Sequence, residues 1–208
     1  MQENPINNIV FDLGGVLVGL DSRRCVEAFQ GIGCQDVGQY VADHRVEDLF
    51  LWQEIGQIST AEFCDEVRRI CCCEATDEAI KWAWNELLTP VSQEKLDLLR
   101  RLKRHYRLFI LSNTNEIHWL KSANDFFGCA DSRCREFFDD VFLSYEIHMA
   151  KPHREIYQYV LEKGNMVAEE TIFIDDSVKN GEAARSLGIG FWHEQSGQDW
   201  LERAKALL

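Results

Sequence analysis

Four short motifs carry the side chains that could do chemistry in this chain. They are IVFDLGGVL with Asp12, LFILSNTN with Ser112 and Asn113, MAKP with Lys151, and TIFIDDS with Asp175 and Asp176. Carboxylate oxygens are hard ligands that suit Mg²⁺, and a lysine and a hydroxyl can hold phosphate oxygens. A carboxylate that is left free to attack phosphorus gives nucleophilic catalysis. These residue types indicate phosphoryl transfer through an aspartyl-phosphate, provided that the fold brings them together.

An alternation of strand and helix patterns predicts how the motifs are positioned. Short apolar runs, typical of buried strands, occupy residues 7–12, 108–111, 141–143, 171–174 and 189–192. Helical patterns at residues 92–105, 154–163 and 179–187 separate the later runs. This order predicts an α/β fold with a parallel Rossmann-like sheet and helices on both faces. Because the carboxyl ends of parallel strands converge at one edge, we expect the four motifs to meet there.

A helical insertion, residues 21–88, interrupts this alternation directly after the first strand. It carries helical patterns and no convincing strand, and Ser59 with Glu62 fits a capping box at the start of one helix. We therefore expect a catalytic core made of residues 1–20 and 89–208, with the small all-helical insertion over the site as a lid. A lid of this size predicts small substrates rather than phosphoproteins, because its closure excludes large molecules.

Aromatic residues of the insertion have two possible roles. Phe63, Trp52, Trp82 and Trp84 lie at spacings compatible with helix packing, so we expect them to be buried. Trp52 could instead face a substrate together with Arg45.

The composition narrows the classes of function and location. The net charge of −13 disfavours nucleic-acid binding, which depends on lysine and arginine neutralising phosphates. The sequence has no apolar run of about 18 residues, so we expect no membrane span. The N-terminus lacks the pattern of a secretory signal. Eight cysteines, three of them adjacent at 71–73, favour free thiols and a cytoplasmic location. The expected partner is a small phosphate ester, and the oligomeric state stays open.

In their order and spacing, the four motifs resemble those of the haloacid dehalogenase superfamily. The resemblance covers residues 8–192, and the insertion is similar to the helical cap of the best-known phosphatase subclass. The segments LSNTN, MAKP and DDS, together with DLGGV, also resemble bacterial sugar-1-phosphate phosphatases. The resemblance implies a Mg²⁺-dependent phosphatase of a small metabolite, with a sugar phosphate such as glucose 1-phosphate as the expected substrate.

The resemblance also implies a metal site. Asp12 would be both nucleophile and metal ligand, with Asp176 and the backbone carbonyl of Gly14 as further ligands. Asp175 would hold a metal-bound water or the lysine. Taken alone, Asp175 and Asp176 could equally well begin the helix that follows them.

On the phosphate side, the resemblance implies that Ser112 and Asn113 bind the phosphate. Lys151 would offset the negative charge of Asp12 and of the phosphoryl group. Taken alone, Lys151 before Pro152 could be an ordinary surface lysine.

One position departs from the family pattern. The family places a second aspartate two residues after the nucleophile, where it protonates the leaving group and later activates water, and this chain has Gly14 there. Acid–base assistance is typically worth about 10²–10⁴-fold in rate. A substrate with a good leaving group, such as an anomeric phosphate, needs less protonation. Alternatively, Asp21 or His118 could supply the proton, although His118 is more typical of a surface helix.

Three other functions remain open. A halide-releasing dehalogenase needs no metal, so the acidic pair at 175–176, which suits a metal ion, disfavours this function. A weakly catalytic member could bind a phosphometabolite or a protein partner, and Gly14 supports that alternative. Phosphate transfer to a sugar would need the missing acid–base group.

Overall fold

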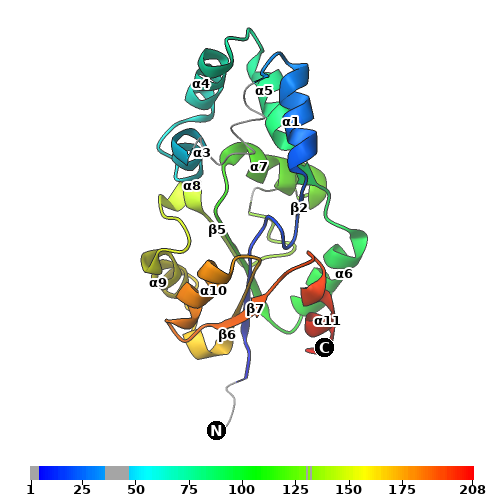
Figure 1. Ribbon diagram of the computed structural model, residues 1–208. Coiled ribbons are helices and arrows are strands. Elements are labelled where there is room, and N and C mark those ends of the chain that lie inside the picture. The colour runs from blue at the N-terminus through cyan, green and yellow to red at the C-terminus, as the bar shows by residue number, and fades with distance from the viewer. Residues whose placement is uncertain (1–4, 36–46, 130, 132) are drawn as a thin grey trace.

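Figure 1 shows the chain as a computed structural model, in which residues 5–35, 47–129, 131 and 133–208 are described. A parallel sheet occupies the lower part of the view, and the helices of the insertion lie above it. Helices cover the sheet on both sides, so the predicted α/β class is confirmed.

The sheet has the strand order β5-β4-β1-β6-β7, and all neighbours are parallel. Its strands are β1 (Asn8–Phe11), β4 (Arg107–Ser112), β5 (Asp140–Leu143), β6 (Thr171–Asp175) and β7 (Gly190–His193). In the register, Phe11 of the central strand is level with Ile110 of β4 and Ile174 of β6. Asp12 therefore leaves the sheet level with Asp175, at the edge where the sequence predicted the site.

Alternate strand residues face two separate apolar layers. The helices of the core are α6 (Gln93–Leu102), α7 (Glu116–Lys121), a π-helix (Ser122–Phe126), α8 (Ser144–Ile147), α9 (Arg154–Lys163), a 3₁₀ turn (Ala168–Glu170), α10 (Val178–Arg185) and α11 (Asp199–Lys205). Ile9 and Phe11 pack in the layer with α6 and α11, whereas Val10 packs in the layer with α9 and α10. Burial on both faces explains why the strands are continuously apolar in sequence.

The insertion has an apolar cluster of its own. Its helices are α1 (Ser22–Gly31), α3 (Glu47–Glu54), α4 (Thr60–Cys71) and α5 (Asp77–Asn85). Phe29, Phe63 and Trp84 are buried between them, and Ile117 of α7 joins the same cluster. The insertion therefore packs directly on the core. Among the described residues, no helix is long and apolar enough to cross a membrane.

Two expectations about the insertion are corrected. Trp52 and Trp82 are 41% and 52% exposed, so only Phe63 and Trp84 are buried as expected. Helical spacing alone does not fix which face of a helix is covered, because that depends on the neighbouring helices.

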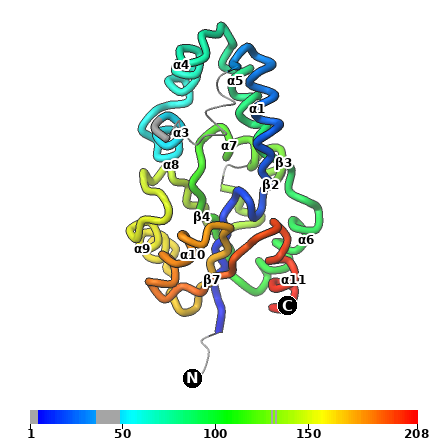
Figure 2. The backbone as a smooth tube through the Cα atoms, viewed as in Figure 1, coloured from blue at the N-terminus to red at the C-terminus, as the bar shows by residue number. Residues whose placement is uncertain are grey.

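A short ribbon joins the insertion to the core. β2 (Gly19–Leu20) and β3 (Leu88–Thr89) pair as antiparallel strands, side by side in Figure 2. The sequence pattern predicts no strand here, because two residues are too few to show an alternation. The ribbon lies at the predicted ends of the insertion, and the division into a core and a lid domain stays a prediction.

Four of the eight cysteines lie in pairs, joined in the structure as disulfides. The Cα atoms of Cys34 and Cys71 are 4.8 Å apart, and those of Cys129 and Cys134 are 5.2 Å apart. Both separations lie in the range of disulfides. The expectation of free thiols is therefore corrected for these four residues, because the sequence does not show which cysteines the fold brings together.

Candidate active site

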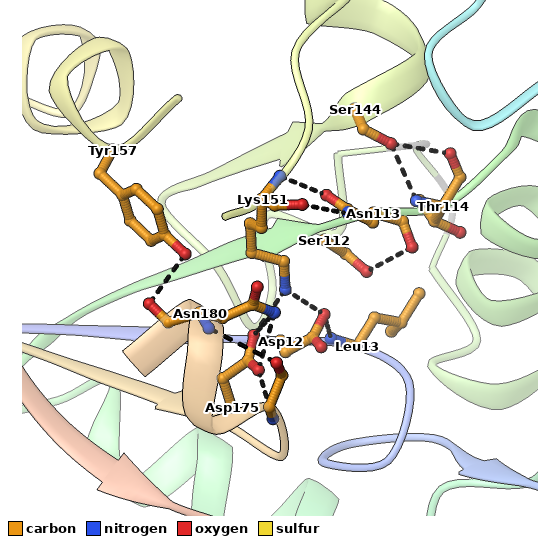
Figure 3. A network of polar contacts seen from close by, with 11 residues as sticks. Asp12, Leu13, Ser112, Asn113, Thr114, Ser144, Lys151, Tyr157, Asp175 and Asn180 are labelled. Atoms are coloured by element: carbon orange, nitrogen blue, oxygen red, sulfur yellow. Dashed lines mark hydrogen bonds and ion pairs between the residues drawn. The ribbon is translucent and has the colours of Figure 1, made fainter. Parts of the chain in front are cut away.

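Lys151 lies at the centre of the polar network in Figure 3. Its Nζ is 2.9 Å from Oδ1 of Asp12 and 2.7 Å from Oδ2 of Asp175, and its side chain is only 1% exposed. A charge buried this deeply needs paired and hydrogen-bonded partners. Burial alone would lower the pKa of Lys151, but the charges of Asp12 and Asp175 outweigh it and raise the pKa. Lys151 is therefore a buried cation, not a surface lysine.

Asp175 is fully buried, and its carboxylate is saturated with hydrogen bonds. Besides Lys151, the backbone N–H of Ser177 donates to Oδ1 at 2.8 Å, and the amide of Asn180 donates to both oxygens at 3.0 and 3.1 Å. Ser177, not the aspartates, caps α10. These contacts fix Asp175 and orient Lys151 toward Asp12.

Asp12 is the more open partner of Lys151. Its side chain is 12% exposed, and Oδ1 accepts both from Lys151 and from the N–H of Leu13 at 2.7 Å. Burial raises the pKa of Asp12 to about 6, with Asp175 adding to the rise and Lys151 opposing it. In the described part of the chain the hydrogen bonds of Asp12 fall on Oδ1, so Oδ2 is the oxygen that is open to a ligand, and a nucleophilic role stays a prediction.

The carboxylates at the strand ends fit a divalent cation. Asp12, Asp175 and Asp176 place one oxygen each within 4.8 Å of one another. Desolvation, and then the charge of Asp175, also raises the pKa of Asp176. One lysine does not balance three crowded carboxylates, so the site favours an additional cation. An all-oxygen ligand set is the one that Mg²⁺ prefers.

Gly15 makes room for Asp176 in the loop after β1. Its φ is +74°, and a Cβ at this position would lie 2.4 Å from Oδ2 of Asp176. Both the left-handed backbone and the close approach require glycine. Lys95 holds the far side of the same loop, because its Nζ donates to the carbonyls of Val16 and Leu17.

The phosphate side of the site is built from the end of β4. Ser112 is buried at the strand end. The side-chain amide of Asn113 donates to the carbonyl of Lys151 at 3.0 Å, and its oxygen accepts from the N–H of Lys151 at 2.8 Å. Asn113 thus clamps the backbone of Lys151, so phosphate binding by its side chain stays a prediction.

The four motifs therefore meet at one edge of a parallel sheet, around a buried lysine and three carboxylates. A model of the haloacid dehalogenase-like hydrolases matches residues 6–188. The chain belongs to this family. The resemblance seen in the sequence is confirmed.

Several known proteins are similar to this chain over nearly its whole length. A D-ribitol-5-phosphate phosphatase of Bacteroides thetaiotaomicron is 30% identical over 203 residues, 98% of each chain. The solved structure of a HAD family enzyme from the same organism has a TM-score of 0.90 at 40% identity, covering 96% of this chain and 98% of that one. A structure of that enzyme with magnesium and inorganic phosphate has a TM-score of 0.87, also at 40% identity, covering 94% and 97%. The L-2-haloacid dehalogenase RSc1362, at a TM-score of 0.67, 16% identity and 97% and 100% coverage, shares the fold alone.

The aspartate that haloacid dehalogenase-like phosphatases usually carry after the nucleophile is absent here. A Cβ at Gly14 would meet the side chain of Leu20 at 3.5 Å, an ordinary packing distance. The side chain of Leu20 thus lies next to the position that the aspartate side chain would occupy, and Leu20 carries no carboxylate that could replace it.

The two proposed substitutes for that aspartate have other partners. Asp21 caps α1 and accepts from the N–H of Arg24 at 3.1 Å. His118 is buried, with Nδ1 3.2 Å from the amide of Asn115 and Nε2 3.1 Å from the carbonyl of Trp84. Burial lowers the pKa of His118 to about 4, so its ring is neutral near pH 7. Acid catalysis by either residue stays a prediction.

Of the two residues of the insertion that could contact substrate, the structure describes only Trp52. Arg45 lies outside the described residues. Trp52 lies on α3 with an exposed side chain, and its contact with substrate stays a prediction.

Sequence reasoning missed three residues around the site. Asn180 bonds to Asp175, and Ser144 contacts the loop after β4 through Thr114. Ser144 directly follows β5, so the strand-end rule that found the other motifs could have found it. Glu54, at the end of α3, interacts electrostatically with Asp12, and no pattern in the insertion pointed to it.

Proposed function

We propose that this chain hydrolyses the phosphate ester of a small sugar or sugar alcohol through an aspartyl-phosphate on Asp12. Mg²⁺ would be held by Asp12, Asp176 and the backbone carbonyl of Gly14. The observation that carries the proposal is the ion network in which Lys151, fixed by Asp175, presents its charge to Asp12.

The relatives confirm the coarser prediction of a phosphatase that uses magnesium. The ribitol-5-phosphate phosphatase aligns over nearly the whole of both chains, and the solved relative binds magnesium together with inorganic phosphate. The dehalogenase alternative has only a likeness in fold to support it. Similarity to a phosphatase over nearly the full length of both chains supports the same reaction here.

The residues of this chain would divide the work of phosphoryl transfer. Oδ2 of Asp12 attacks phosphorus while Lys151 holds a phosphoryl oxygen and offsets the charge that builds there. Asp175 keeps Lys151 in place, and the hydroxyl of Ser112 hydrogen-bonds another phosphoryl oxygen. Bound Mg²⁺ supplies further charge compensation and aligns the phosphate with the nucleophile. Water then attacks the aspartyl-phosphate and releases inorganic phosphate.

Two substrates are favoured by separate observations. An open-chain polyol phosphate such as ribitol 5-phosphate follows from the full-length relative. Glucose 1-phosphate follows from Gly14, because an anomeric oxygen leaves with less need of a proton. The first is our leading candidate, since full-length similarity bears on the whole site and Gly14 bears on one step.

A panel of esters tests this function. With Mg²⁺ the purified chain should release phosphate from ribitol 5-phosphate or glucose 1-phosphate faster than from glycerol 3-phosphate. Asp12→Asn should remove turnover, because an amide is no nucleophile toward phosphorus, and chelation of Mg²⁺ should do the same.

The outcome would separate the alternatives. Binding of these esters without turnover, with Mg²⁺ present, would contradict the proposal and support the weakly catalytic binding member. Turnover that survives Asp12→Asn would exclude the aspartyl-phosphate. Retention of the folded state by the variant, checked by circular dichroism, is the control.

A further inference from the structure

The proposed reaction leaves one proton without a donor. A primary alkyl phosphate such as ribitol 5-phosphate expels an alkoxide unless its leaving oxygen is protonated. Gly14 offers no side chain, Asp21 caps a helix, and His118 is a neutral ring in contact with Trp84. The structure brings a different carboxyl group to the site from the insertion, on Glu54.

The backbone of Glu54 is tied to the loop that carries the phosphate-binding residues. The hydroxyl of Ser144 donates to the carbonyl of Glu54 at 2.5 Å and accepts from the N–H of Thr114 at 2.9 Å. Thr114 directly follows Asn113, which clamps Lys151. One hydroxyl therefore connects the last residue of α3 to the wall of the active site.

The turn after α3 is also pressed against the core. The carbonyl of Ile55 lies 2.9 Å from Nδ1 of His148. At Gly56, where φ is +66°, a Cβ would lie 2.2 Å from the carbonyl of Tyr145. Backbone meets backbone here, so the position of Glu54 is set by direct packing of the insertion on α8.

The carboxyl group of Glu54 interacts electrostatically with Asp12 and Lys151. Burial raises the pKa of Glu54 to about 7, the charge of Asp12 adds to the rise, and Lys151 opposes it. The other ionisable side chains on the segment that packs against it are Tyr145, Glu146, which pairs with Arg133, and His148. A carboxyl group poised in this range can both give and take a proton near neutral pH.

We propose that Glu54 is the general acid and base of this phosphatase, in place of the aspartate that is missing at position 14. The proposal rests on the phosphatase function proposed above. In the first step Oδ2 of Asp12 bonds to phosphorus, the bond to the leaving oxygen breaks, and that oxygen takes the proton of Glu54. In the second step the Glu54 carboxylate takes a proton from water, the water oxygen bonds to phosphorus, and the bond to Asp12 breaks.

A comparison of leaving groups tests the role of Glu54. Glu54→Gln keeps the size and hydrogen-bonding shape of the side chain but cannot donate a proton as an acid. For ribitol 5-phosphate, or the alkyl ester that wild type prefers, kcat/KM should fall by about 10²–10⁴-fold. For p-nitrophenyl phosphate, whose leaving group departs as a phenolate without a proton, kcat/KM should change less than about 5-fold.

The second step has its own signature. With p-nitrophenyl phosphate, Glu54→Gln should give a burst of nitrophenol stoichiometric with enzyme and then slow turnover. The burst arises because the phosphorylated Asp12 waits for water that no base activates. Glu78→Gln, on the exposed face of α5, is the matched control and should behave as wild type.

Each other result bears on a different claim. Equal losses on both ester types, or a loss on neither, would overturn the role of Glu54 while leaving the phosphatase function standing. The selective loss of alkyl esters in Asp21→Asn, with Glu54→Gln unchanged, would move the role to Asp21. If wild type hydrolysed no ester with Mg²⁺, the proposed function itself would fail, and this inference with it.

Discussion

At the scale of single residues, the site holds more negative charge than its one lysine balances. Lys151 pairs with Asp12 and Asp175, while Asp176 stands within 4.8 Å of both carboxylates. Burial raises the pKa values of Asp12 and Asp176, and the charge of Asp175 adds to both rises. The excess charge that disfavours the empty site is what favours a divalent cation in it, so stability and metal binding are linked.

Removing the lysine should make this link measurable. Lys151→Met leaves the buried carboxylates without their partner, which typically costs about 3–5 kcal/mol when one member of a buried ion pair is lost. Mg²⁺ should therefore raise the melting temperature of Lys151→Met more than that of wild type, with chelator present as the reference state. Lys81→Met, which breaks only a surface pair with Glu78, is the control. Equal shifts in all three proteins would contradict the linkage.

At the scale of elements, polar contacts join the insertion to the core, one of them exposed and one buried. Thr60 at the start of α4 donates to Glu116 of α7 at 2.6 Å, and His118 of α7 contacts the carbonyl of Trp84. The ring of His118 also packs on Trp84, with centroids 4.5 Å apart. A neutral ring suits this apolar junction, and protonation of the ring would place a charge inside it.

Stability should therefore fall in acid through His118. Its pKa is about 4 in the folded chain against 6.5 for the free side chain, so between these values the unfolded chain binds more protons. The free energy of unfolding then decreases as the pH falls from 6.5 to 4, by roughly 3 kcal/mol at most from this residue. Urea unfolding at pH 7 and pH 4.5 should show a smaller decrease for His118→Gln than for wild type. The same decrease in both proteins would show that other groups carry the acid sensitivity.

Much of the element order was predictable from the sequence, and particular exceptions show where local pattern ends. The helix over 154–163 has the predicted bounds, and the strand at 171–174 is longer by Asp175 alone. Both have continuous local signals. The β2–β3 ribbon is too short to have a period, and the exposure of Trp52 depends on which helices are its neighbours.

The site divides in the same way. Asp12 and Asp175 were predictable, because parallel strands bring their carboxyl ends together whatever the intervening sequence. Glu54 was not, because it reaches the site only through the packing of α3 on α8, and that packing leaves no periodic signal.

At the scale of the whole molecule, the insertion and the core meet at the edge of the sheet where the motifs converge. Figure 1 shows α3 directly above α8, the helix that follows β5, and the turn after α3 contacts Tyr145. A substrate bound at this edge would meet both parts of the chain, and we expect both to limit its size.

This arrangement predicts selection by size. Small sugar phosphates should be hydrolysed, whereas a folded phosphoprotein should not. The protein surface around its phosphorylated side chain would collide with the insertion and the core before the phosphate reached Asp12. Release of inorganic phosphate from the two substrate types, at equal concentrations of phosphate ester, is the measurement. A short phosphopeptide serves as an intermediate case, and rapid dephosphorylation of the folded protein would contradict the prediction.

The β2–β3 ribbon has a consequence for how such a chain can change over generations. Because Gly19 pairs with Thr89, the backbone leaves the core and returns to it at neighbouring positions. The cost of closing a loop grows only slowly with its length, so the segment between these points can lengthen, shorten or be exchanged with little effect on the sheet. The phosphoryl-transfer machinery can thus be inherited nearly unaltered while selection reshapes the part that chooses the substrate.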